Sequence, residues 1–294
     1  MSQHAYVDGQ YMPLADAMVP IEDRGLQFAD SIYEVVAVLN GQLLDWPAHL
    51  VRLRRNLAAL FIPPAVSEAA LGMIARRLVC KARFTEGLVY MQISRGSARR
   101  DHGFPANIQP RLMMTARRFD FHQRAAQQRT GISVLSVPDQ RWGRVDIKTT
   151  GLLANVLAKQ DARVAGAFEA WFVAEDGTVR EGSSTNGWIV QGGRLLTPPL
   201  SAHILPGIAR AALLRLARAA GLEVEEKAFS LEQAYAADEA LLTSTTAPLL
   251  PIVRIDGRAI GSGQPGPVAA RLATLVADDI YQQTGWRSTG RSRA

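Results

Sequence analysis

Strand-like and helix-like segments alternate irregularly along this chain of 294 residues. Residues 5–45 read as strands joined by turns, one of them the Asn40-Gly41 pair typical of hairpins. Helices are expected over 46–62 and 67–83, a strand that runs into a loop over 87–100, and another strand over 110–119. The first of these helices places four leucines on one face: Leu50, Leu53, Leu57 and Leu60. An irregular order of this kind favours an α+β chain with two lobes over one doubly wound sheet.

The stretch 120–131 is polar and has no periodicity, so it is the best candidate for a linker between two domains. We therefore expect a small N-terminal domain over 1–120, a linker over 121–128, a larger domain over 129–284 and a frayed tail over 285–294. The larger domain is expected to hold strands over 132–137, 167–177, 186–199 and 239–257, and helices over about 152–165, 205–221 and 266–284.

Charge and composition exclude several classes of function. The net charge is +6, but the basic residues are scattered and no basic stripe is interleaved with aromatic residues, which disfavours nucleic-acid binding. The positive charge is instead expected to attract an anionic small molecule. Cys80 is the single cysteine, the N-terminus does not resemble a signal peptide, and there is no apolar run of 18 residues. These features predict a cytoplasmic protein without a membrane span and without a disulfide.

A lysine stands between a strand-like and a helical segment in the stretch RVDIKTTGLLANVLAKQ, residues 144–160. One interpretation of Lys148 is a solvated surface side chain, which is the fate of most lysines. The other is an amine held at the end of a strand, where it forms a Schiff base with a carbonyl compound. The lysine alone does not decide between the two.

A carboxylate and several anion-binding groups favour the second interpretation. Glu181 lies 33 residues after the lysine (181 − 148 = 33), before a Gly-Ser-Ser-Thr-Asn turn that contains Ser183. Pyridoxal phosphate needs an amine for its aldehyde, an anion for its ring nitrogen and donors for its phosphate. The expected phosphate donors are the helix start at Ile208 and Ala209, the hydroxyls of residues 243–246 and the guanidinium of Arg52.

At this point the chain resembles the fold-type IV pyridoxal-phosphate enzymes, a family of transaminases and aminodeoxychorismate lyases. The resemblance covers about residues 5–284 and rests on EDRGLQFADSIYE, HLVRL, SRG, DIKTT, LAKQDA, EGSSTN, LPGIAR and TSTT, in that order. It implies a two-domain α+β fold with a small N-terminal α/β lobe, a larger C-terminal lobe with a strand-rich, barrel-like core, and the cofactor at the junction. A homodimer is also implied.

The resemblance assigns roles to individual residues. It implies that Lys148 is the Schiff-base lysine and that Glu181 holds the pyridine nitrogen. It implies that Arg52, Ile208 and Thr245 bind the phosphate, with Ser244 and Thr246 near it. Ala209 and Ser183 are also expected at the cofactor. The chain departs from the family pattern at Ala209, where a threonine is usual, and at Pro248, which puts the wall of the side-chain pocket in doubt.

The loop SRGSARRDHGFP, residues 94–105, resembles that of the D-amino acid transaminases. In that group an Arg-x-His motif and a tyrosine bind the substrate carboxylate, and these positions match Arg100, His102 and Tyr33. The expected activity is transamination between a D-amino acid and a 2-oxo acid such as 2-oxoglutarate or pyruvate. The alternatives on the same fold are a branched-chain or (R)-amine transaminase and an aminodeoxychorismate lyase. A non-catalytic protein that binds pyridoxal phosphate is the alternative outside enzymes.

Overall fold

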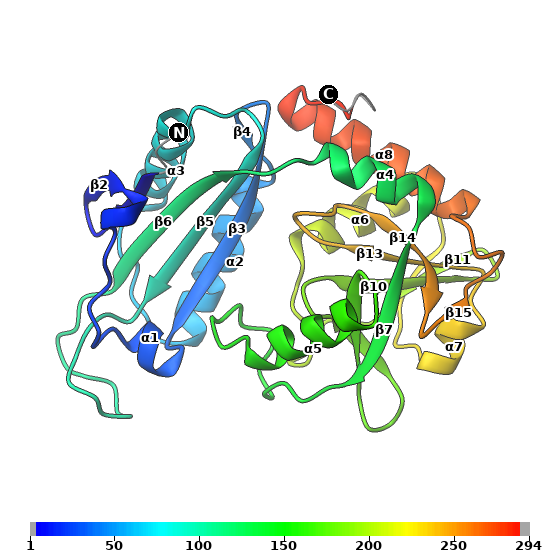
Figure 1. The fold of residues 1–294 in the computed structure, drawn as a ribbon, viewed down its shortest axis with the longest axis horizontal. Coiled ribbons are helices and arrows are strands. Elements are labelled where there is room, and N and C mark those ends of the chain that lie inside the picture. The colour runs from blue at the N-terminus through cyan, green and yellow to red at the C-terminus, as the bar shows by residue number, and fades with distance from the viewer. Residues whose placement is uncertain (1–3, 289–294) are drawn as a thin grey trace. The chain divides into compact units, whose positions relative to one another are not determined.

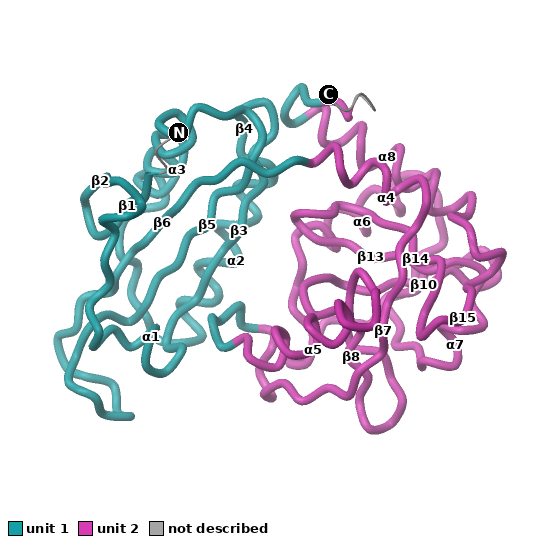
Figure 2. Tube along the Cα trace, in the orientation of Figure 1, with its two compact units in different colours: residues 1–120, 147–151, 283–286 teal, residues 121–146, 152–282, 287–294 magenta. Residues whose placement is uncertain are grey.

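The computed structural model describes residues 4–288, and within that range the chain forms two compact units. Unit 1 contains residues up to 120 together with 147–151 and 283–286, whereas unit 2 contains 121–146 and 152–282 (Figures 1 and 2). The first segment of unit 1 ends at Asp120. The return of residues 147–151 to unit 1 was not expected.

Unit 1 is built on an antiparallel sheet in the order β2-β1-β6-β5-β3-β4, counting the strands of the described residues. Its strands are β1 (His4–Val7), β2 (Gln10–Pro13), β3 (Ser31–Leu39), β4 (Gln42–Leu43), β5 (Gly87–Ser94) and β6 (Arg111–Arg118). β3 and β5 pair without a register shift from Ser31 opposite Ser94 to Val38 opposite Gly87. Such uninterrupted pairing fixes which β3 side chains share a face.

Two helices, α2 (Trp46–Ala59) and α3 (Glu68–Ala82), bury their apolar faces against this sheet. The four leucines of the first helix behave as expected: Leu53 and Leu57 are buried in the core, and Leu50 and Leu60 pack against it. The unit also contains a 3₁₀ turn η1 (Leu14–Asp16) and a short helix α1 (Arg24–Phe28). The sequence did not predict α1, because five residues are too few to show a helical period.

Unit 2 is built on a nine-stranded mixed sheet, again counting described residues, in the order β12-β11-β10-β13-β14-β7-β8-β9 with β15 beside β14. Its strands are β7 (Ile132–Pro138), β8 (Glu169–Val173), β9 (Val179–Gly182), β10 (Asn186–Gln191), β11 (Arg194–Thr197), β12 (Val224–Glu226), β13 (Glu239–Thr243), β14 (Leu250–Ile255) and β15 (Arg258–Ala259). β9 forms one edge, yet a tight turn leads from it directly into β10 in the interior of the sheet. The sheet therefore curls, which agrees with the expected strand-rich, barrel-like core.

Alternation along the strands of unit 2 separates two cores. Trp188 and Leu241 pack toward one cluster, whereas their neighbours Ile189 and Leu242 belong to another. The period of two in a strand places successive side chains on opposite faces, so both faces of the sheet are covered. The helices of this unit are α4 (His122–Thr130), α5 (Leu153–Val164), α6 (Ile208–Ala219), α7 (Leu231–Tyr235) and α8 (Pro267–Thr284).

The fold confirms the α+β class and most expected elements, with two differences. Residues 121–128, where we expect an interdomain linker, form most of α4, which packs beside β14 in unit 2. Residue 284 does not close the second domain, since 283–286 group with unit 1, where Asn40 donates to the carbonyl of Thr284 at 3.1 Å. The expected tail over 285–294 lies partly outside the described residues. No helix in the described range is long and apolar enough to cross a bilayer.

Candidate active site

Lys148 belongs to a short segment that is bound to β3 in unit 1. The backbone amide of Tyr33 donates to the carbonyl of Lys148 at 3.0 Å, and the next residue, Thr149, forms an isolated antiparallel bridge with Ile32. The prediction that Lys148 sits at the end of a strand is wrong in detail, because β7 ends at Pro138 and turns fill most of the interval. The rigid support for the lysine comes from β3 instead.

The amine of Lys148 lies over the face of Tyr33, with Nζ 4.1 Å from the ring centroid. An aromatic face attracts a cation through its quadrupole, so this ring holds the amine near β3. Tyr33 in turn stacks on Tyr90, with ring centroids 5.6 Å apart. Burial, together with the neighbouring Tyr33, raises the pKa of Tyr90 to about 12, so that phenol stays protonated at neutral pH. The structure thus brings together Lys148 and Tyr33, two residues that the sequence singled out for different reasons.

Arg52 lies on α2 and is held by a fully buried carboxylate. Its Nε and Nη2 donate to the two oxygens of Glu34 at 2.8 and 2.6 Å, and Nδ1 of His49 lies 2.7 Å from the same carboxylate. Glu34 is 0% exposed. Burial alone would raise the pKa of Glu34, but the charge and hydrogen bonds of Arg52 and His49 outweigh it and lower that pKa to about 2. A guanidinium carries five N–H donors, and Glu34 accepts two of them.

The predicted substrate-binding loop also lies in unit 1, and the side chains of Arg100 and His102 are exposed. Both approach the ring of Phe28, Arg100 at 5.1 Å from its centroid and His102 at 5.5 Å between centroids. The loop therefore presents a cationic side chain and an imidazole next to each other, the combination that recognises a carboxylate.

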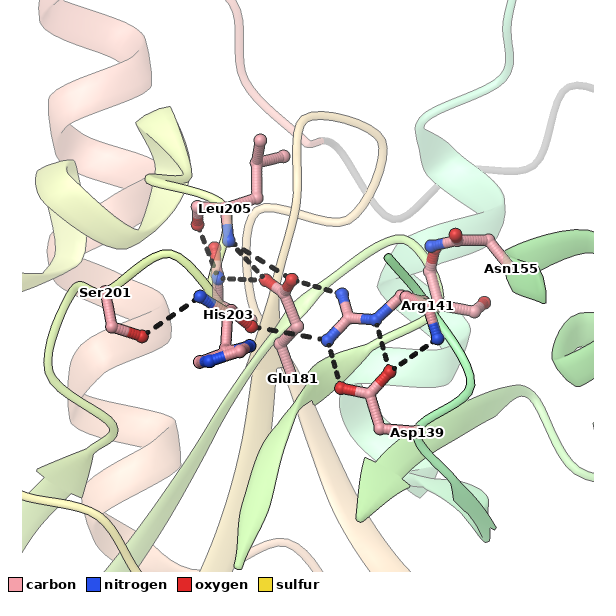
Figure 3. Close-up of polar contacts among 9 residues, drawn as sticks. Asp139, Arg141, Asn155, Glu181, Ser201, His203 and Leu205 are labelled. Atoms are coloured by element: carbon pink, nitrogen blue, oxygen red, sulfur yellow. Dashed lines mark hydrogen bonds and ion pairs between the residues drawn. The ribbon is translucent and has the colours of Figure 1, made fainter. Parts of the chain in front are cut away.

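Glu181 occupies the centre of a charged network in unit 2 (Figure 3). Its carboxylate is 4% exposed and accepts from Arg141 at 2.5 Å, from the amide of Asn186 at 3.0 Å and from the backbone of Leu205 at 3.1 Å. A second carboxylate, Asp139, binds the same guanidinium through Nε and Nη2, both at 2.9 Å. Burial would raise the pKa of Asp139, but hydrogen bonds and the charge of Arg141 lower it. Arg141 thus carries two anions at once.

The hydroxyl of Ser183 is engaged inside unit 2. It donates to Glu169, a carboxylate with 0% exposure, and Ser184 donates to the other oxygen of Glu169 at 2.8 Å. Glu169 therefore holds the turn after Glu181 through the hydroxyls of Ser183 and Ser184. The expected contact of Ser183 with the cofactor remains a prediction.

The expected phosphate donors of unit 2 lie at a helix start and after a strand. No side chain of the described residues caps α6, whose first residues are Ile208 and Ala209. The hydroxyl of Thr243, the last residue of β13, is buried and accepts a hydrogen bond from Trp188 at 3.1 Å. The hydroxyl of Ser244 accepts from the amide of Ala247 at 3.1 Å and shapes the turn that carries Thr245.

Four residues of these charged clusters were not predicted from the sequence: Glu34, His49, Arg141 and Glu169. Three of them leave a signal that could have been used. Glu34 and Glu169 are carboxylates in largely apolar strand sequences, and His49 precedes Arg52 by three residues, which places both on the same face of the helix. Arg141 lies in an irregular, charged stretch and has no such signal.

Comparison with known proteins identifies the family. The pattern that defines the family Amino-transferase class IV matches residues 31–255. The chain belongs to this family. The matched span includes Lys148, Arg52 and Glu181, together with the loop of Arg100 and His102.

The relatives cover nearly the whole chain. It is similar to the D-alanine aminotransferase of Bacillus licheniformis, with 39% identity over 277 residues that cover 94% of this chain and 97% of the relative. It is also similar to that of Listeria monocytogenes serotype 4b (strain F2365), with 34% identity over 280 residues that cover 95% and 96%.

Solved structures of the same family show the same fold. The branched-chain amino acid aminotransferase of Escherichia coli has a TM-score of 0.88 at 25% identity and covers 98% of this chain and 96% of its own. The enzyme of Thermoproteus uzoniensis, solved with norvaline, has a TM-score of 0.84 at 27% identity and covers 97% and 98%.

Class IV aminotransferases use pyridoxal phosphate as their cofactor, and the residues of this structure fit that group. The amine of Lys148 makes no hydrogen bond or ion pair within the described residues, which leaves it to react with an aldehyde. Glu181 supplies a buried carboxylate, and the uncapped start of α6 supplies amides for an anion. The three requirements of the cofactor are therefore met by the chemistry of the side chains present.

Proposed function

We propose that this aminotransferase moves the amino group of a D-amino acid, D-alanine in particular, to a 2-oxo acid. The proposal is carried by the joint presence of Arg100 and His102 on one loop in a chain whose relatives are D-alanine aminotransferases. The solved structures of branched-chain enzymes support the fold. At 25% and 27% identity they do not indicate that this chain uses branched-chain substrates.

Within this proposal the cofactor is held by the residues that the family resemblance assigns to it. Lys148 would provide the amine for its aldehyde, Glu181 would pair with its ring nitrogen, and Ser183 would lie close to it. Its phosphate is bound by these residues: Arg52, Ile208, Ala209, Ser244 and Thr245. When bound, pyridoxal phosphate supplies a carbonyl that takes up the amino group and a ring that accepts the electrons of the Cα–H bond.

The chain's own residues then do three things. Arg100, His102 and Tyr33 bind the substrate carboxylate and orient the substrate so that the single Cα–H bond of the D-enantiomer faces the base. Lys148 removes the proton from Cα through its Nζ atom. Arg141 keeps the Glu181 carboxylate in place, because its guanidinium is itself clamped by Asp139.

A homodimer is part of the proposal. α5 exposes an apolar stripe, with Leu153 73% exposed, Val156 60%, Leu157 56% and Val164 78%. These residues share one side of the helix, and a stripe of this kind favours burial against another chain. The test is sedimentation equilibrium. We expect the wild type to be a dimer and the Leu157→Asp variant to be a monomer. A monomeric wild type would contradict this part of the proposal.

The experiment that tests the activity is a visible absorption spectrum of the holoenzyme with D-alanine and L-alanine added separately. We expect D-alanine, and not L-alanine, to convert the bound cofactor to its pyridoxamine form, and Lys148→Ala to lose turnover. A preference for L-alanine would replace the proposal with the branched-chain activity. A response to neither substrate would favour an (R)-amine transaminase or an aminodeoxychorismate lyase and would likewise overturn it.

A further inference from the structure

We propose that Phe28, backed by the buried cluster of Arg24, Asp30 and Arg95, is a positioning residue that sets the geometry of Arg100 and His102 for a carboxylate ligand. This inference rests on the proposed function, since it concerns the same carboxylate-binding pair. The residues that support this pair lie on α1, just after α1 and at the start of the loop, all within unit 1.

The ring of Phe28 is a common platform for the two exposed side chains. The guanidinium carbon of Arg100 lies 5.1 Å from the ring centroid, and the imidazole of His102 meets the ring edge-to-face at 5.5 Å and 67°. The guanidinium of Arg24 approaches the same ring at 4.9 Å. Because Arg100 and His102 both contact one ring, the position of that ring constrains the distance between the guanidinium and the imidazole.

Arg24 holds the backbone of the loop directly beside these side chains. It is 3% exposed, and its Nη1 and Nη2 donate to the carbonyls of Asp101 and His102 at 2.6 and 3.4 Å. Its Nε donates to Asp30 at 2.8 Å. One buried guanidinium therefore fixes the peptide groups on both sides of His102, and Asp30 fixes the guanidinium.

Arg95 completes the cluster at the start of the loop. It binds Asp30 through Nε and Nη2 at 2.7 and 3.0 Å, and its guanidinium lies 3.7 Å from the ring centroid of Phe104. Burial of Asp30 would raise its pKa, but hydrogen bonds from Arg95 and Arg24 lower it, so the carboxylate remains charged. Asp30 thereby joins the beginning of the loop to its middle.

The physical consequence is preorganisation. Arg100 and His102 are long or rotatable side chains on an exposed loop, and ordering them only on binding would weaken the affinity for a carboxylate. The cluster orders the loop in advance, so its loss should raise KM for a carboxylate substrate without changing the proton transfer at Cα.

The variants that test this are Phe28→Leu, which keeps an apolar side chain but removes the ring, and Phe28→Tyr, which keeps the ring as a matched control. Should Phe28→Leu fold poorly, the second variant is Arg24→Lys. It keeps the positive charge that faces Asp30 but loses the guanidinium that donates to two backbone carbonyls. The substrates are D-alanine and (R)-1-phenylethylamine, which has no carboxylate.

For Phe28→Leu and Arg24→Lys we expect KM for D-alanine to rise roughly tenfold with kcat little changed. Turnover of the amine and both parameters of Phe28→Tyr should stay within about twofold of wild type. Hydrogen–deuterium exchange of the peptide 97–105, measured without substrate, should be several-fold faster in the first two variants. Equal losses for D-alanine and the amine, or unchanged KM and unchanged exchange in an active enzyme, would overturn the inference. A wild-type enzyme without activity on D-alanine would instead count against the proposed function, and the exchange experiment would still test the platform.

Discussion

Replacing Glu34 with glutamine should destabilise unit 1 strongly. The substitution keeps the shape of the side chain but removes the charge that Arg52 and His49 face at 2.6–2.8 Å. Removing one partner of a buried ion pair typically costs about 3–5 kcal/mol, because the remaining charge stays desolvated. A surface carboxylate would cost far less, so the size of the loss measures the burial of this cluster.

The pH dependence gives an independent value for the same contribution. The pKa of Glu34 is lowered from 4.5 to about 2 in the folded protein. A depressed pKa contributes stability that is fully present above the unfolded value and is lost as pH falls through the folded value. At 1.36 kcal/mol per pKa unit, the shift corresponds to about 3 kcal/mol at pH 7 and to about 2 kcal/mol at pH 3.5.

The assay is urea unfolding of wild type and Glu34→Gln at both pH values, followed by pulsed hydrogen–deuterium exchange of peptides from β3. Exchange of these peptides isolates unit 1 from the unfolding of unit 2. We expect the difference in unfolding free energy between the two proteins to be smaller at pH 3.5 than at pH 7. A difference below about 1 kcal/mol at pH 7, or one that does not change with pH, would refute this account of the cluster.

Three further substitutions probe other parts of the structure through the free energy of unfolding in urea. Arg141→Met should cost about 3 kcal/mol or more, because Glu181 and its neighbouring carboxylate lose their shared cation; a loss under 1 kcal/mol would contradict the network. Gly96→Ala should cost at least about 2 kcal/mol, since φ is +117° and a Cβ would lie 2.1 Å from a backbone oxygen, whereas the control Gly143→Ala meets no atom within 4 Å and should change stability by less than about 0.5 kcal/mol. Ser230→Ala should cost about 1 kcal/mol through loss of the capping box of α7, and an unchanged midpoint would show that this helix end is stable without it.

The helices and strands of this chain could be predicted because their signals are local. The leucine stripe of α2 and the apolar run of β3 each fit within one element. α4 was missed because its polar sequence shows no period, and its position beside β14 depends on residues more than 100 positions away.

The site residues divide in the same way. Lys148, Glu181 and Arg52 stand in motifs that can be recognised one at a time. Their supports could not be predicted, because they join segments that are distant in sequence, as when the backbone of Lys148 meets β3 or Arg141 bridges to β9. A charged residue in a loop looks the same in a sequence whether it is solvated or clamped.

The pairing of residues 147–151 with β3 has a consequence for recombination between related enzymes. A chimera that joins two parents near residue 120 would take β3 from one parent and the lysine segment from the other. Most of the hydrogen bonds between β3 and the lysine segment would persist in such a chimera, because those around Ile32 and Lys148 connect backbone atoms that every parent possesses. Contacts between side chains do depend on the parents, as in the hydrogen bond between the hydroxyls of Ser31 and Thr150, 2.5 Å apart, and the contact of Lys148 with the ring of Tyr33. Shuffled libraries should therefore inherit positions 31 and 150 from the same parent, although 119 residues separate them.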